Sequence, residues 1–137
     1  MKTMNIDLNR TIRATPEQVF EVWLDPKSPG GPWHGSERAI VNAVVDGLFY
    51  HSVQHAGRTW AHYGRFLTLD RGKKIEHTWM SEATKGIETV VTLTLTPKDG
   101  GTEVKLTHTN VPDDELGRSH QDGWTYILKA VAERLEK

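Results

Sequence analysis

The chain contains no cysteine, so neither disulfide bonds nor thiolate chemistry is available to it. It also lacks an apolar run of membrane-spanning length, and its N-terminal stretch has no apolar core of the kind that a signal peptide needs. An excess of positive charge is missing too, because 17 Lys and Arg side chains stand against 18 Asp and Glu. We therefore expect a cytoplasmic protein that binds neither membranes nor nucleic acids.

Motifs for common cofactors and reactions are absent as well. The sequence has neither the P-loop nor the G-x-G-x-x-G motif of nucleotide-binding proteins, and it has no G-x-S-x-G motif of esterases. The sequence contains neither a His-x-His nor an H-E-x-x-H motif of a metal site. We therefore expect no bound cofactor.

The chain contains enough apolar residues to form the core of one globular domain. Hydrophobic residues make up 36% of the 137 residues and charged residues 26%, and no linker, repeat or low-complexity tract divides them. We predict a single domain over residues 1–137. Five Trp and seven His are more than the composition of so short a chain would suggest, so their positions guide the search for a site.

The last stretch, Asp113–Lys137, has the pattern of an amphipathic helix. Its apolar residues recur at three- and four-residue steps, with carboxylates at its start and cations at its end. A helix of about 23 residues would be about 34 Å long, and a broad surface is needed to cover its apolar face. The predicted apolar stripe consists of Leu116, His120, Gly123, Trp124, Ile127, Val131 and Leu135.

Strand signals predominate in the rest of the chain. One short helix interrupts them, since Thr15 and Gln18 form a capping-box pattern around Pro16. Short Gly-containing turns join the later strands, which predicts an antiparallel meander and an α+β fold. The predicted strands are Met4–Ala14, Ala39–Val45, Leu48–His55, Arg58–Leu69, Lys74–Ser81, Ile87–Thr96 and Thr102–Asn110.

A loop rich in Gly and Pro, Lys27–Gly35, follows the short helix and contains Trp33. A tryptophan in such a loop is either a gate over a pocket or an anchor that packs the loop onto the core. The sequence leaves both interpretations open.

Tight turns predict which residues lie opposite one another in the sheet. They are centred on Ala56-Gly57, Arg71-Gly72 and Asp99-Gly100. A slip of one residue would turn every side chain of a strand to the other face, so the register decides which residues meet. The predicted opposite pairs are His51 with His62, Phe49 with Gly64, Phe66 with His77, and Val91 with His108.

On this register, one face of the sheet carries large rings interspersed with histidines. Such a composition is typical of a small-molecule pocket, and equally of an ordinary aromatic core. We expect a ligand-binding cavity between this face and the C-terminal helix. Its predicted lining is Trp33, Phe49, His51, Trp60, His62, Phe66, His77, Trp79, Val91, His108, His120, Gly123, Trp124 and Ile127.

Short motifs in a fixed order run along nearly the whole chain. They are the stretch from Thr11 to Phe20, Trp33, Asp46-Gly47-Leu48-Phe49, Gly64-Arg65-Phe66, His77-Thr78-Trp79, Thr89–Leu93, Gly100–Val104, Leu106–His108 and Gly123-Trp124. Together they resemble the START-like (SRPBCC) superfamily. More narrowly, they resemble the bacterial homologues of the heat-shock-protein-90 ATPase activator C-terminal domain. One departure is Asp46, which stands where the family's motif has a glycine.

The resemblance implies a helix-grip fold, in which a curved antiparallel sheet wraps around a long C-terminal helix, often with a cavity between them. Members of the superfamily include lipid and hormone binders, polyketide cyclases and co-chaperone domains, so the fold does not choose among these functions. A chaperone or another protein is therefore an implied partner. The eukaryotic co-chaperone has an additional N-terminal domain, for which we expect no room in this chain, and this puts chaperone activation in doubt.

Four hypotheses about function follow. The first is a protein that binds a small apolar or aromatic ligand, with Gly123 allowing the sheet or the ligand to approach the helix. The second is an enzyme that uses His51, His62 or His108 as a general acid or base, because imidazole titrates near neutral pH. The third is a metal site formed by His51, His62 and a third histidine. The fourth is a chaperone-linked interaction module; the chain is expected to be a monomer or a homodimer.

Overall fold

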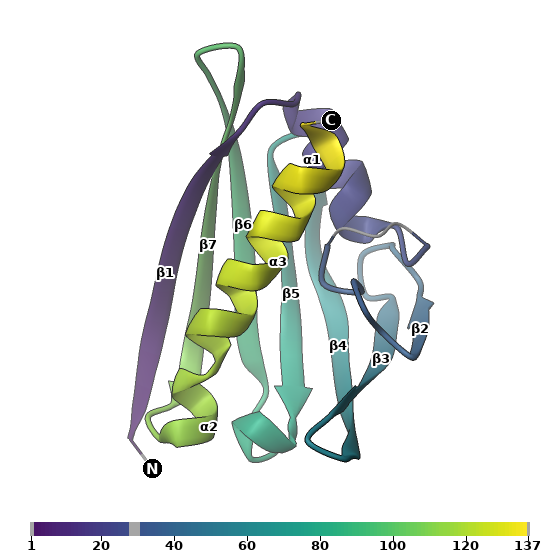
Figure 1. Ribbon diagram of the computed structural model, residues 1–137, viewed down its shortest axis with the longest axis vertical. Coiled ribbons are helices and arrows are strands. Elements are labelled where there is room, and N and C mark those ends of the chain that lie inside the picture. Colours follow the sequence, from purple (N-terminus) through teal and green to yellow (C-terminus); the bar gives the residue numbers. More distant parts are fainter. Residues whose placement is uncertain (1, 28–30, 137) are drawn as a thin grey trace.

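The computed structural model describes residues 2–27 and 31–136, and its centre is a seven-stranded antiparallel sheet with α1 and α3 on the same side (Figure 1). This is the α+β helix-grip fold that the sequence predicts. The strands are β1 (Thr3–Ile12), β2 (Arg38–Val41), β3 (Leu48–His55), β4 (Arg58–Asp70), β5 (Lys74–Ser81), β6 (Thr89–Lys98) and β7 (Gly101–Pro112). The helices are α1 (Pro16–Leu24), α2 (Glu115–Arg118) and α3 (His120–Leu135), with a 3-10 turn, η1, at Glu82–Thr84.

The strands lie in the order β1-β7-β6-β5-β4-β3-β2, so β2 to β7 form a meander and β1 pairs with β7. Two-residue turns connect β3 to β4 and β6 to β7, because His55 pairs with Arg58 and Lys98 with Gly101. These turns set the register of their own hairpins, as predicted. Between β4 and β5 the predicted two-residue turn at Arg71-Gly72 is wrong, because Asp70 pairs with Lys74, and a β-bulge between Phe66 and Thr68 restores the predicted pairing of Phe66 with His77. The observed pairs include His51 with His62, Phe49 with Gly64, Phe66 with His77, and Val91 with His108.

Strand β2 ends at Val41 and not at Val45, as the sequence had predicted. The chain turns instead, because the Val44 N–H donates to the Asn42 carbonyl (2.9 Å) and the Gly47 N–H donates to the Val44 carbonyl (2.8 Å). Local hydrogen bonds therefore replace the sheet pairing over this stretch. Val44 and Val45 remain exposed to solvent.

The predicted capping box of α1 is present. The Thr15 hydroxyl accepts a hydrogen bond from the Gln18 N–H (3.1 Å), and the Gln18 side chain accepts one from the Thr15 N–H (2.9 Å). Two of the N–H groups that a helix start leaves unpaired are thereby satisfied. The helix buries Phe20 and Trp23 against the sheet and the last helix.

The C-terminal helix is divided, and the prediction of one continuous helix over Asp113–Lys137 is wrong. Asp114 caps the short helix α2, since its carboxylate accepts a hydrogen bond from the Gly117 N–H (2.7 Å). A Cβ on Gly117 would collide with the Pro112 carbonyl, so this turn is held against the end of β7. Helix α3 then begins at His120.

The buried face of α3 differs from the predicted stripe. Its buried residues are Trp124, Leu128, Val131 and Ala132, with Ile127 and Leu135 partly buried beside them. Gly123 is exposed, and apart from its chain neighbours and the backbone of its own helix no atom lies within 4 Å of the place where its Cβ would be. The prediction that Gly123 allows the sheet or a ligand to approach the helix is therefore wrong.

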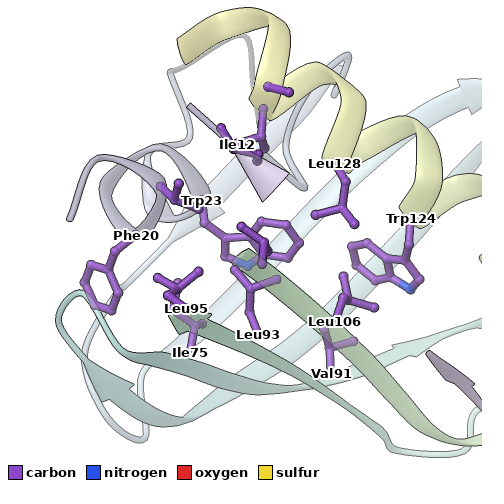
Figure 2. Packing of buried hydrophobic residues seen from close by; sticks show 14 of the residues in the cluster. Ile12, Phe20, Trp23, Ile75, Val91, Leu93, Leu95, Leu106, Trp124 and Leu128 are labelled. Carbon is purple, nitrogen blue, oxygen red and sulfur yellow. The ribbon is translucent and has the colours of Figure 1, made fainter. Parts of the chain in front are cut away.

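The core lies between the sheet and the two longer helices, as Figure 2 shows. Trp23 of α1 and Trp124 of α3 stack there with their ring centroids 5.9 Å apart. Fully buried aliphatic side chains from β6 and β7, such as Leu93 and Leu106, lie below them. None of the helices in the described part of the chain has the length and apolar character needed to cross a membrane.

Candidate functional site

Strands β3, β4 and β5, together with the loop after α1, bring four rings together on the face of the sheet that the helices cover. His51 on β3 lies opposite His62 on β4, and their rings stack with centroids 4.5 Å apart and planes 12° apart. Trp79 on β5 contacts both histidines, at 5.2 and 5.0 Å. Trp33 contacts His51 from the loop after α1, at 5.2 Å. We call Trp33, His51, His62 and Trp79 the ring cluster.

Trp33 is an anchor of its loop in this structure. Its side chain is only 2% exposed and packs edge-on against Phe49, with centroids 5.0 Å apart. The sequence left open whether this tryptophan covers a pocket or packs onto the core. The observed contacts correspond to the second interpretation.

Each member of the ring cluster has one buried ring nitrogen without a hydrogen-bond partner among the described residues. A buried polar group left unpaired costs about 1–3 kcal/mol, and folded proteins rarely retain several of them together. This concentration of unpaired groups distinguishes the ring cluster from the rest of the aromatic core. The four atoms are Trp33 Nε1, His51 Nε2, His62 Nδ1 and Trp79 Nε1.

His108 is also buried, but both of its ring nitrogens are engaged. The Trp124 indole N–H donates to His108 Nδ1 (2.9 Å), so the proton of the neutral ring is on Nε2. That Nε2–H donates to the Thr89 hydroxyl (2.6 Å), which donates in turn to the Trp79 carbonyl (2.5 Å). This chain of hydrogen bonds ties α3 to β5, β6 and β7, and it leaves His108 no free nitrogen for proton transfer to a ligand.

Both ring nitrogens of His77 are also hydrogen-bonded, and one of them accepts from a second tryptophan. The Trp23 indole N–H donates to His77 Nε2 (3.4 Å), and His77 Nδ1 donates to the Thr78 carbonyl (3.0 Å). His77 and His108 are therefore structural residues that accept hydrogen bonds from the helices. His51 and His62, in contrast, retain ring nitrogens that a ligand would find unpaired.

Burial keeps these histidines uncharged at neutral pH. Burial and, to a smaller extent, the neighbouring His62 lower the pKa of His51 to about 3. Burial also lowers the pKa of His62 and of His77 to about 4, and that of His108 to about 2. The pKa of His120 is lowered for the same reason. The site is therefore neutral, and its rings offer hydrogen bonds without a charge.

One hydroxyl group joins the ring cluster at His51. The Ser36 Oγ lies 3.1 Å from His51 Nδ1, which is the contact of a serine nucleophile with its general base. A histidine with a pKa near 3 is, however, a weak base at neutral pH. The geometry thus permits proton transfer between these two groups, while the pKa of His51 makes general-base catalysis inefficient.

The residues at the ring cluster do not fit a metal site. Ring lone pairs point outward in the ring planes, so two stacked imidazoles such as His51 and His62 cannot both direct a nitrogen at an ion between them. Within residues 2–27 and 31–136, no three His, Asp or Glu side chains lie close enough to hold a metal ion. The hypothesis of a third histidine ligand therefore has no support.

The other predicted lining residues are distributed over three regions. Phe49, Phe66, His77 and Val91 are buried beneath the ring cluster as part of the continuous core. Trp60 lies near the β3–β4 hairpin, where Arg58 covers its ring at 4.0 Å and its indole N–H donates to the His55 carbonyl. The half-buried His120 lies at the start of α3, with its ring edge-on to His108.

The interior at the ring cluster is closely packed. Rings 4.5–5.2 Å apart leave no space for another ring between them. Two surface hollows of about 350 Å³ each lie elsewhere on the described chain, and neither is lined by a member of the ring cluster. A ligand that reaches the unpaired nitrogens must therefore displace side chains as it binds.

The sequence does not predict the contacts of three residues in this region, Ser36, Thr89 and Trp23. Ser36 follows the Gly- and Pro-rich loop with no pattern that marks it. Thr89 shares the alternation of the buried Val91 and Leu93, but no sequence signal shows that its hydroxyl meets His108. Trp23 was placed correctly on the apolar face of α1, but its hydrogen bond to His77 depends on how α1 docks on the sheet. Only tertiary contacts reveal these partners.

A family model for Activator of Hsp90 ATPase homolog 1-like proteins matches residues 13–136. The chain belongs to this family. The match includes every member of the ring cluster, and it agrees with the START-like superfamily that the sequence motifs indicated. No protein with a curated description matches the sequence.

Solved structures support the same assignment. The protein CV1439 from Chromobacterium violaceum is 26% identical, with a TM-score of 0.81 over 98% of this chain and 99% of that one. Mll3558 from Rhizobium loti is 16% identical, with a TM-score of 0.82 over 98% of both chains. The Aha1 dimer from Colwellia psychrerythraea is 19% identical, with a TM-score of 0.73 over 97% of this chain and 96% of that one. The last two show that the fold is shared.

Proposed function

We propose that this protein binds a small, mainly aromatic or apolar ligand that carries hydrogen-bond acceptors, and that the ligand binds at the ring cluster. The observation that carries the proposal is the set of four unpaired buried ring nitrogens. Two of them, on Trp33 and Trp79, are indole N–H groups, which can only donate. The ligand must therefore supply acceptors such as carbonyl, ether or phenol oxygens.

The energetics of the site support this choice of ligand. Each unpaired buried group carries a cost of about 1–3 kcal/mol, and a ligand atom that pairs with it removes that cost. Since neighbouring rings already contact one another, this gain offsets the work of moving them apart. A ligand without acceptors would have to separate the rings and leave the nitrogens unpaired.

The charge of the site further restricts the class of ligand that fits. Because His51 and His62 are neutral at pH 7, the ring cluster offers no cation to pair with a carboxylate or phosphate. An uncharged ligand therefore fits better than an anion. The half-buried His62 and His120 lie at the border of the cluster, and the ligand enters there.

Two probe molecules of the same shape test the proposal. 1-Tetralone has a ring ketone that accepts hydrogen bonds, and tetralin is the same bicycle without the oxygen. In a ¹H–¹⁵N NMR titration, tetralone should shift the indole N–H resonances of Trp33 and Trp79 in a saturable manner, while that of Trp124 stays in place. Tetralin should bind about tenfold more weakly, as expected for one lost hydrogen bond.

The variant Trp79→Phe serves as the matched control, because it removes the N–H donor and keeps an aromatic ring. It should reduce the preference for tetralone over tetralin. The proposal is wrong if tetralone causes no saturable shift, or if the wild-type protein binds both molecules equally.

A further inference from the structure

Strand β1 leaves a long edge of the sheet without a partner. Its ten residues pair with β7 on one side only, and Figure 1 shows the strand at the left border of the sheet. The strand at the opposite border, β2, is only four residues long. About half of the backbone N–H and C=O groups of β1 therefore point away from the sheet, where a further strand can bind them.

The sequence of β1 does not protect this edge. Soluble proteins usually block a free edge with proline, lysine or a very short strand, and Thr3–Ile12 contains neither proline nor lysine. Its one carboxylate, that of Asp7, accepts a hydrogen bond from the Thr107 hydroxyl on β7 (3.1 Å) and so leans toward the sheet. From Ile6 to Ile12 the strand pairs regularly with β7, so this part of the edge can accept an added strand.

The side chain of Arg10 lacks a partner at this edge. Arg10 alternates with the buried Ile12 and the partly buried Leu8, so it lies on the face of β1 that is turned toward the helices. Its Nε is buried without a hydrogen-bond partner, and no ion pair within residues 2–27 and 31–136 includes Arg10. Removing a charge from water is costly unless the charge is paired. A carboxylate beside the half-buried guanidinium would offset that cost.

A surface hollow of about 350 Å³ lies farther along the same strand. It is found between the start of β1 and the region where α2 ends and α3 begins. A side chain on a strand next to β1 points to the same face as the β1 residue opposite it, so it can reach this hollow. The hollow is lined by Met4, Asn5, Ile6, Arg118, Gln121 and Asp122.

We propose that the free edge of β1 binds an extended segment of another protein, which carries a carboxylate and adds to the sheet as an eighth strand. The carboxylate lies opposite Arg10, and an apolar side chain lies opposite Ile6 at the hollow. Since Ile6 and Arg10 are four residues apart on one face, the two side chains of the partner are also four residues apart, about 13 Å along the strand. Backbone hydrogen bonds supply the affinity, and these two side chains supply the specificity.

The edge strands of a second copy of this chain do not have the required charge. Side chains alternate along an added strand, so its carboxylate must stand on the same face as Arg10. Strand β2, Arg38–Val41, contains no carboxylate. The residues of β1 on that face are not acidic either; they are Met4, Ile6, Leu8, Arg10 and Ile12. Pairing of two copies edge to edge would therefore leave Arg10 without an anion.

A synthetic peptide with the required pattern tests the proposal. The acetylated and amidated sequence Thr-Glu-Thr-Val-Thr-Leu-Thr, bound antiparallel to β1, has its glutamate opposite Arg10 and its leucine opposite Ile6. In a ¹H–¹⁵N NMR titration the peptide should shift the backbone amide resonances of β1 in a saturable manner. Alternate amides of β1, which lack a partner in the free protein, should exchange with deuterium about tenfold more slowly in the complex, because the added strand binds them.

Substitutions on both sides isolate the contact with Arg10. Replacing the glutamate of the peptide by glutamine should weaken binding about tenfold, the loss expected for one charge-assisted hydrogen bond. Arg10→Gln should weaken binding of the original peptide to the same extent, with little effect on the glutamine peptide. Arg38→Gln is the matched control, because it removes the same charge from the other edge strand and should leave the affinity unchanged. Tetralone should not compete with the peptide, since β7 and β6 separate β1 from the strands of the ring cluster.

The proposal is overturned if the peptide does not bind, or if the β1 amides exchange as fast with the peptide as without it. It is also overturned if the glutamine peptide binds as tightly as the original, or if Arg38→Gln weakens binding as much as Arg10→Gln does. Circular dichroism verifies that both variants fold. If Arg10→Gln does not fold, the comparison of the two peptides on the wild-type protein still decides the outcome.

Discussion

The four buried tryptophans differ in whether their indole N–H groups have a hydrogen-bond acceptor. Trp23 and Trp124, which come from the helices, donate to His77 and His108 on the sheet. Trp33 and Trp79 have no acceptor among the described residues. The first pair therefore holds the helices on the sheet, while the second pair leaves hydrogen-bonding capacity unused at the ring cluster.

A comparison of two phenylalanine substitutions tests this difference. Trp124→Phe should reduce the free energy of unfolding by about 1–3 kcal/mol more than Trp79→Phe does. Both changes remove a similar part of a buried ring, but only Trp124→Phe leaves the buried His108 Nδ1 without its donor. Urea denaturation of the two variants measures the difference, and equal losses of stability would contradict the structural role assigned to Trp124.

At the scale of elements, the turns were more informative than the helix pattern. The two-residue turn at Ala56-Gly57 was sufficient to place His51 opposite His62, because side chains alternate strictly along a strand. The helix face was predicted less well. Gly123 is exposed and Leu128 is buried, contrary to the prediction. The apolar stripe of a helix is wide, and the sheet on which the helix packs decides which side of the stripe is buried.

Gly123→Ala is expected to stabilise the protein by about 0.5–1 kcal/mol. Gly123 lies inside α3, where glycine costs conformational entropy, and open space surrounds the position of the added methyl group. Thermal unfolding should therefore show a raised midpoint. A lowered midpoint would mean that the glycine contacts something, as the sequence had predicted.

For the whole molecule, the buried histidines predict acid sensitivity. The pKa of His51, His62, His77 and His108 lies between about 2 and 4 in the folded state, whereas an unfolded histidine has a pKa near 6.5. Below about pH 6.5 the unfolded chain therefore binds protons that the folded protein does not. Stability is lost as the pH falls through this range.

The free energy of unfolding should fall by several kcal/mol between about pH 6.5 and pH 5, since each such histidine contributes up to about 1.4 kcal/mol per pH unit. Urea denaturation at several pH values measures this slope. The range lies above the ordinary pKa of carboxylates, so their protonation contributes little to it. Stability that is independent of pH over this range would contradict the neutral, buried state of the histidines.

By itself, the sequence determined the order of the elements, the register of the β3–β4 and β6–β7 hairpins and the family. These features depend on local signals, namely turn residues, capping residues and the alternation of side chains. Only the tertiary structure decided which histidines are engaged. His108 and His51 have the same alternation on their strands, yet a tryptophan of α3 reaches one of them and not the other. The hydrogen-bond partners of a buried ring come from distant parts of the chain, and their positions depend on how the helices dock.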